Sequence, residues 1–148
     1  NTENIMIHEF AHAIHLNGIY DVDTTFDKRL AETYKTAMAK GFWKSKYAAN
    51  NKAEYWAEGV QSWFNTNRPP DHGHNHVDTR EELKTYDPSL AKLVEEIFGD
   101  SEWRYKRPSQ RKSPGHLQGF DPLKTPTFKW PKELNDFYLK YIRNQNKT

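Results

Sequence analysis

The chain has 148 residues, which is the length of about one domain. Its 22 Lys and Arg and 20 Asp and Glu give a formal charge of +2, which excludes the strongly basic surface that drives non-specific binding to nucleic acid. The absence of Cys excludes disulfides, thiolate metal sites and thiol nucleophiles. No apolar run approaches the roughly 20 residues that span a membrane.

The apolar content is low for a core that holds itself together, with 35% hydrophobic residues and a mean hydropathy of −1.05. Five Trp, 8 Tyr and 8 Phe partly compensate, because each aromatic side chain buries a large area. Two explanations remain for the low content. A bound metal helps to hold the fold, or the chain is a fragment of a longer protein, to which the missing initiator Met and signal peptide point.

The sequence predicts a mainly α fold in a single domain over residues 1–148, with no strand. Apolar residues at helical spacing and capping residues indicate helices over 2–16, 25–40, 52–65, 79–85, 88–98 and from Pro131 onward. Four prolines and two glycines over 100–130, with no helical period, predict a long irregular segment there.

The expected helix ends follow from local signals. Gly18 is expected to end the first helix, for which Thr2 is the candidate cap. Asp78 with Glu81 resembles a capping box at the start of the helix over 79–85. Asp87-Pro88 and Gly99 are expected to begin and end the helix over 88–98.

The most informative motif is His8-Glu9-Phe10-Ala11-His12, an H-E-x-x-H pattern. Residues i and i+4 lie one turn apart on one helix face, so both imidazoles can bind one ion at about 2 Å from each ring nitrogen. Glu9 lies about 100° round the axis from His8, which suits a general base beside zinc rather than a third ligand. An amphipathic helix that merely carries polar residues on one face is the alternative.

His15 shares this stripe but lies about 10 Å along the axis from His8, too far for all three histidines to bind one ion. We interpret it as a packed or cleft-lining residue. The extended metzincin pattern H-E-x-x-H-x-x-G-x-x-H is not met, because its third-histidine position holds Gly18. The third ligand must therefore come from elsewhere.

Glu54 and Glu58 are the best source of that ligand, because they lie at i and i+4 on the helix expected over 52–65. Like charges at this spacing cost a few tenths of a kcal/mol, which a nearby cation would remove. We expect Glu54 to bind zinc and Glu58 to hold a histidine N–H beside the metal. The alternative is a capping box of Asn51 and Glu54, with Glu58 an ordinary exposed residue.

Together the two segments resemble the gluzincin metallopeptidases, and most of all the anthrax lethal factor type. H-E-F-A-H is similar to the H-E-F-G-H of that type, and Y-A-A-N-N-K-A-E-Y-W-A-E has a tyrosine, Tyr47, seven residues before Glu54, as that type does. The match covers residues 4–64. It implies a zincin-like catalytic core with a zinc helix and a glutamate helix, in a chain that lacks the upstream β-sheet of the family.

The resemblance also implies a site and an activity. It implies one Zn²⁺ held by His8, His12 and Glu54, with Glu9 as general base for the hydrolysis of peptide bonds. It further implies that the Tyr47 phenol stabilises the oxyanion and that Glu58 supports a ligand. A packed surface aromatic is the alternative for Tyr47.

A second group of histidines, His72, His74 and His76, lies in the polar loop expected over 66–77. Three interpretations are open: a solvated loop, a loop that lines the active-site cleft, or a second metal site. His116 is either structural or cleft-lining. A nuclease of the HNH type does not fit, because the charge is nearly neutral and no ββα hairpin is expected.

Three functions remain. The first is a zinc peptidase acting on a peptide or protein. The second is an inactive zinc-binding module of the same fold that binds protein or glycan, and the third is a structural helical domain whose H-E-x-x-H is accidental. No nucleic acid partner and no membrane span are expected, and the oligomeric state is left open. The sequon Asn146-Lys147-Thr148 favours an extracellular, secreted protein.

Overall fold

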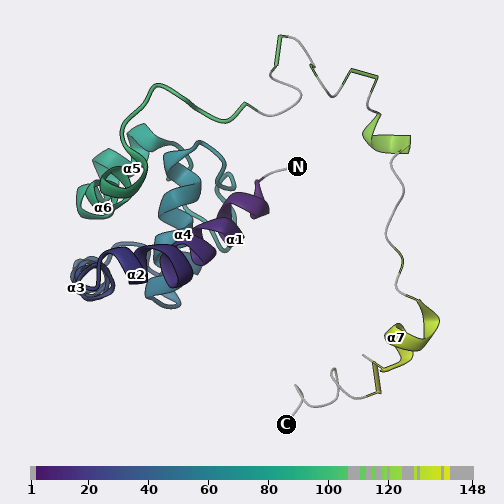
Figure 1. Cartoon of the computed structure of the whole chain (residues 1–148), viewed down its shortest axis with the longest axis horizontal. Coiled ribbons are helices and arrows are strands. Elements are labelled where there is room, and N and C mark those ends of the chain that lie inside the picture. The colour runs from purple at the N-terminus through teal and green to yellow at the C-terminus, as the bar shows by residue number, and fades with distance from the viewer. Residues whose placement is uncertain are drawn as a thin grey trace. The chain divides into compact units, whose positions relative to one another are not determined.

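The computed structural model describes residues 3–106, 111–112, 115, 118–119, 121–124, 129, 131–137 and 139–140. The chain divides into two compact units, Asn1–Lys106 and Arg107–Thr148, both drawn in Figure 1. The candidate site lies entirely in the first unit. The expectation of one catalytic domain over residues 1–148 stays a prediction.

The described part of the first unit is built from helices and contains no strand, which confirms the mainly α class. In chain order the elements are α1 (Ile5–Ala13), the π-helical segment η1 (Ile14–Ile19), α2 (Tyr20–Val22), α3 (Phe26–Ala39), the 3₁₀ turn η2 (Tyr47–Ala49), α4 (Lys52–Trp63), α5 (Arg80–Tyr86) and α6 (Pro88–Phe98). The helices expected over 25–40 and 52–65 agree with α3 and α4.

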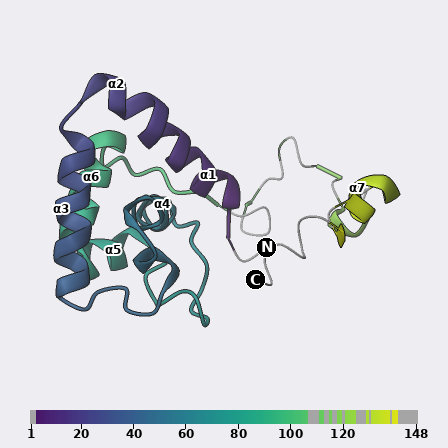
Figure 2. The ribbon, with the colours of Figure 1, turned by 90° about the horizontal axis from the view of Figure 1, so that it is seen from below.

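Helix α4 is the centre of the unit, and every residue over 55–63 is buried. Figure 2 shows α4 almost end-on, with α1 on one side and α3 on the other. Gly59 permits close packing of α6, because a Cβ at this position would lie 2.6 Å from Leu90 Cδ2. A helix buried all round holds its side chains rigidly, which matters because α4 also carries Glu54 and Glu58.

The first helix does not end where the sequence predicts. Instead of ending at Gly18, the helical path continues through η1 and α2 to Val22. Gly18 is exposed inside the π-helical segment, and the chain makes no turn there that would need the backbone conformations open only to glycine. Burial explains the continuation, because His15 and Ile19 both pack inward from η1 and hold the wider turn against the core.

The capping box of α5 is one residue further along than predicted. Thr79, not Asp78, is the N-cap, and its hydroxyl and backbone N–H are paired with the backbone and side chain of Glu82 rather than Glu81. The shift buries Leu83 and Arg80 on the inner face of the helix. The expected ends of α6 are confirmed, with the Asp87 side chain accepting from the Leu90 N–H, Pro at the first position and Gly99 after the last.

In the second unit the structure describes the 3₁₀ turn η5 (Pro122–Lys124) and α7 (Lys132–Phe137). Helix α7 falls within the helix expected from Pro131 onward. Thr2 and His116 lie outside the described residues, as does part of the segment expected to be irregular over 100–130, whose described residues 100–106 form no helix.

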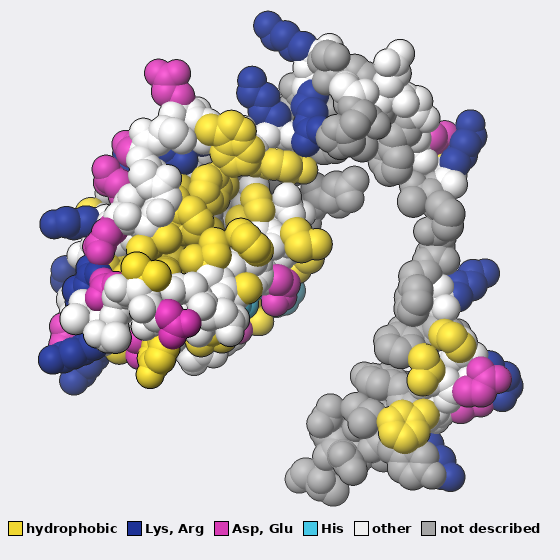
Figure 3. Space-filling model, viewed as in Figure 1, with side chains coloured by type: hydrophobic (Ala, Val, Ile, Leu, Met, Phe, Trp, Pro, Cys, Tyr) yellow, Lys and Arg dark blue, Asp and Glu magenta, His cyan; other side chains and the backbone are white. Residues whose placement is uncertain are grey.

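The surface of the first unit carries apolar side chains. On the face seen in Figure 3 they gather into a patch. The large exposed apolar residues of α1, η1 and α2 are Ile5, Met6, Phe10, Leu16, Tyr20 and Val22. None of the described helices combines the length and the apolar character needed to cross a membrane.

Candidate metal centre

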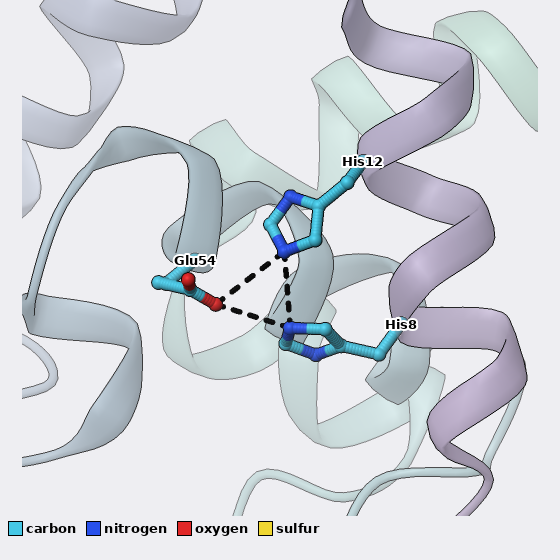
Figure 4. A group of neighbouring side chains, drawn as sticks. All are labelled: His8, His12 and Glu54. Carbon is cyan, nitrogen blue, oxygen red and sulfur yellow. Dashed lines mark hydrogen bonds and ion pairs between the residues drawn. The ribbon is translucent and has the colours of Figure 1, made fainter. Parts of the chain in front are cut away.

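Two helices bring three metal-binding side chains together. His8 and His12 lie one turn apart on α1, and Glu54 lies in the first turn of α4 (Figure 4). The Nε2 atom of His8 is 3.0 Å from Glu54 Oε2 and 3.1 Å from His12 Nε2. The third side of this triangle, from His12 Nε2 to Glu54 Oε2, is 3.5 Å.

Local contacts explain why α1 and α4 meet at this point. Ala11 is buried against α4, and its carbonyl oxygen accepts a hydrogen bond of 3.0 Å from Trp56 Nε1. At the start of α4 the Asn51 side chain accepts from the N–H groups of Ala53 and Glu54, so Asn51 is the N-cap. Among the described residues, the Asn51 half of the expected capping box forms, and the Glu54 carboxylate contacts His8 rather than completing the box.

The other nitrogen of His8 is held by a residue that the sequence analysis missed. Gln61 Oε1 lies 2.9 Å from His8 Nδ1, and Gln61 Nε2 donates to the Asn4 carbonyl oxygen at 3.3 Å. The second bond fixes the orientation of the amide, so the oxygen faces the ring and Nδ1 must carry the proton. In the neutral ring, Nε2 then presents its lone pair to His12 and Glu54.

Glu58 is buried beside the same ring, with 3% of its surface exposed, so it is not an ordinary exposed residue. Its Oε1 is 3.5 Å from His8 Nδ1, and its Oε2 accepts from Asn67 Nδ2 at 3.0 Å. Burial raises the pKa of the Glu58 carboxyl. At 2.9 Å, Gln61 is within normal hydrogen-bond distance of His8 Nδ1, whereas Glu58 at 3.5 Å is at the limit of that distance.

The three converging atoms fit a zinc ion. Tetrahedral zinc with bonds of about 2.0–2.1 Å places its ligand atoms about 3.3 Å apart, which is close to the triangle of 3.0, 3.1 and 3.5 Å. With the His8 proton on Nδ1, the lone pair of His8 Nε2 and the Glu54 carboxylate face each other at 3.0 Å, an arrangement that a shared cation would stabilise. Two imidazoles and one carboxylate are also a donor set that zinc prefers. Among the described residues, His8, His12 and Glu54 are the one group of three found suited to hold a metal.

The resemblance also implies roles for Glu9 and Tyr47. Glu9 follows His8 on α1 with an exposed side chain, and the Tyr47 ring in η2 lies 6.1 Å from the His8 ring. Partial burial and the charges of Glu54, Glu58 and Glu9 raise the pKa of the Tyr47 phenol. The phenol therefore keeps its proton and remains a hydrogen-bond donor near neutral pH.

The structure places His15 in the core. Its ring contacts Phe26 and Trp56, and its Nε2 is 3.1 Å from Asp27 Oδ1. Burial lowers the pKa of His15. Of the two interpretations left open by the sequence, packing describes this residue.

The histidine loop reaches the site through one of its three histidines. His74 Nε2 lies 3.6 Å from Glu58 Oε1, whereas His72 and His76 are exposed. The His76 ring packs edge-on against Tyr86, away from the triangle. The remaining candidate, His116, lies outside the described residues.

The candidate metal centre combines three parts of the first unit. Its parts are a ligand triangle from α1 and α4, a carboxylate next to the first ligand, and a phenol close to both. No protein-family model matches the chain, and no curated protein or solved structure matches it significantly.

Proposed function

We propose that this chain is a zinc-dependent peptidase of the gluzincin type, in which His8, His12 and Glu54 hold one Zn²⁺. The observation that carries the proposal is the convergence of two ring nitrogens and one carboxylate oxygen within 3.0–3.5 Å of one another. The H-E-x-x-H spacing and the Tyr47-to-Glu54 spacing support it independently, because they are properties of the sequence.

The metal and the protein divide the chemistry between them. When bound, Zn²⁺ supplies Lewis acidity that polarises a substrate carbonyl and makes water acidic near neutral pH. Glu9 accepts a proton on its carboxylate as water attacks the scissile carbonyl carbon, and then returns that proton to the nitrogen of the leaving amine. Its exposure leaves the carboxylate open to water and substrate.

Tyr47 and Gln61 have separate tasks in this proposal. The Tyr47 hydroxyl donates a hydrogen bond to the carbonyl oxygen of the substrate as negative charge develops there. Its raised pKa suits this task, because the phenol stays protonated while the reaction proceeds. Gln61 takes no part in proton transfer and keeps His8 in the tautomer whose Nε2 can bind metal.

The experiment that tests the proposal compares Glu9→Gln with the wild-type chain on a mixed peptide library. General acid–base catalysis contributes typically about 10²–10⁴-fold, so we expect kcat to fall by at least about 100-fold. Zinc content should remain at one ion per chain, because Glu9 is not a ligand. A chelator should abolish wild-type hydrolysis, and added zinc should restore it.

Glu95→Gln is the matched control, because Glu95 is an exposed glutamate on α6, away from the ligand triangle. We expect wild-type activity from it. Full activity in Glu9→Gln, or hydrolysis that persists in excess chelator, would contradict the proposal. Bound zinc without hydrolysis of any peptide would favour the inactive zinc-binding module instead.

A further inference from the structure

The turn over residues 71–74 is built around one carboxylate. Asp71 Oδ1 accepts hydrogen bonds from the backbone N–H groups of Gly73 and His74, each 2.8 Å long. The same oxygen accepts from Nδ1 of the His74 ring at 2.9 Å. These bonds, the ring bond first, hold the pKa of Asp71 below its usual range. Asp71 thus sets both the backbone of the turn and the orientation of the His74 ring.

The oriented ring faces the metal centre through Glu58. His74 Nε2 is 3.6 Å from Glu58 Oε1, an ion-pair distance rather than a hydrogen bond, and its side chain is 12% exposed. The same carboxylate oxygen lies 3.5 Å from His8 Nδ1. The Oε1 atom of buried Glu58 therefore lies close to two imidazole rings, those of the proposed ligand His8 and of His74.

The turn is also attached to the segment that carries Tyr47. The Tyr47 N–H donates to the Gly73 carbonyl oxygen at 2.8 Å, and Lys46 Nζ donates to the Asp71 carbonyl oxygen at 3.0 Å. The Tyr47 and His74 rings stack, with centroids 6.3 Å apart and planes inclined by 27°. The position of the turn is thereby tied to the proposed oxyanion-binding phenol as well as to Glu58.

A buried carboxylate needs partners for both oxygens, because its desolvation is costly. In Glu58 one oxygen is satisfied by Asn67, and the other faces the two rings. If the His74 ring were removed, Glu58 Oε1 would lose the contact on its loop side, and the carboxylate would be free to move relative to the His8 ring that Gln61 holds. Such changes around a ligand typically lower metal affinity by about 10–100-fold.

We infer that Asp71 and His74 form a positioning pair for the metal centre: Asp71 orients the His74 ring, and the ring, which stacks on Tyr47 and contacts Glu58, fixes the place of the Glu58 carboxylate beside His8. The inference rests on the metal site of the proposed function. It gives the histidine loop a task that is neither direct metal binding nor contact with substrate.

The test measures metal affinity, which does not depend on any substrate. Zinc binding to the full chain is measured by competition with a chromophoric chelator. We expect His74→Ala to weaken binding about tenfold. His74→Gln, which keeps a polar side chain near Glu58, should recover part of the loss, and Asp71→Asn should weaken binding in the same direction. In the cobalt-substituted protein, the visible ligand-field spectrum of His74→Ala should differ from that of the wild type, which a purely structural role would not cause.

His72→Ala is the matched control, because His72 belongs to the same loop and is exposed. Its affinity should stay within about twofold of the wild type. Circular dichroism of each metal-free variant shows whether it is folded, and Asp71→Asn replaces His74→Ala in the comparison if the alanine variant is not folded.

Three outcomes would overturn the inference. In the first, wild-type binding is tight and His74→Ala, or Asp71→Asn if the alanine variant is not folded, binds equally well. In the second, His72→Ala loses as much affinity as His74→Ala. Both leave the proposed function standing. If the wild-type chain binds no zinc, the proposed function and the inference fail together, whereas zinc binding without hydrolysis removes only the peptidase.

Discussion

His8 is the residue on which most of the site depends. Its ring contacts His12 and Glu54 through Nε2 and Gln61 through Nδ1, and it is 4% exposed. A ligand imidazole that donates its second N–H to a fixed acceptor is held in one tautomer and one orientation. Gln61 therefore matters as much to the proposed zinc site as a ligand that touches the metal.

Replacing Gln61 by Met tests this role. Met has a similar volume and no comparable hydrogen-bond acceptor, so the core stays filled while His8 Nδ1 loses its partner. We expect zinc affinity to fall by about 10–100-fold. Affinity is measured by chelator competition, with the thermal midpoint of the metal-free protein as a check on folding. Unchanged affinity in a folded variant would show that Gln61 does not orient the ligand.

The residues of the site differ in how visible they are in the sequence. The meeting of His8, His12 and Glu54 was predicted from the i, i+4 spacing of the first motif and of Glu54 and Glu58, and from the resemblance to the gluzincins. Gln61 lies at i+7 from Glu54, on the same helix face as Glu54 and Glu58. This spacing is visible in the sequence, but a glutamine at that position does not by itself indicate a metal site. The position of His74 depends on the path of a loop, which no local pattern determines.

At the scale of elements, helix ends that depend on local signals agree with the sequence. Asn51 and Asp87 are side chains that cap the helix they precede, so α4 and α6 begin as predicted. Where the first helix was expected to end, tertiary packing decides, because the π-helical turn follows burial of His15. Helix α5 instead begins at a neighbouring local signal, the capping box of Thr79 and Glu82, one residue beyond the predicted pair.

Asp23 joins the end of α2 to α3 and makes stability depend on pH. Its carboxylate accepts from the backbone and hydroxyl of Thr25 and pairs with Arg29, and Arg29 also pairs with Glu96 of α6. The Thr25 and Arg29 hydrogen bonds lower the pKa of Asp23 from 3.8 to about 2. A carboxyl whose pKa is lower in the folded state stabilises the fold above its unfolded pKa, and the stabilisation disappears as pH falls through the folded value.

We therefore expect Asp23→Asn to be less stable than the wild type at neutral pH, by a small amount because the side chain is partly exposed to solvent. The difference should shrink as pH falls from about 4 and should vanish below about 2, where Asp23 is protonated in both states. Urea unfolding of the two metal-free proteins between pH 2 and 7 measures it. If the difference in unfolding free energy between the two proteins did not change with pH, the ionised Asp23 carboxylate could not be its cause.

At the scale of the whole molecule, the first unit compensates for its low apolar content with aromatic and buried polar contacts. Asp87 accepts hydrogen bonds from the Tyr55 hydroxyl at 2.6 Å and from Trp43 Nε1 at 3.0 Å, which ties α4 to the start of α6 and to the segment before η2. The same central helix presents Glu54 to α1. The proposed metal would thus bridge α1 and α4, and its binding would add to the stability of the unit.

The measurement that tests this most directly is anomalous diffraction from crystals of the wild-type chain grown with zinc, recorded on both sides of the zinc absorption edge. We expect one strong peak at about 2 Å from each of His8 Nε2, His12 Nε2 and Glu54 Oε2. A map with no anomalous density among these atoms, and with the Glu54 carboxylate turned out of the triangle at saturating zinc, would contradict the metal centre and the function proposed from it.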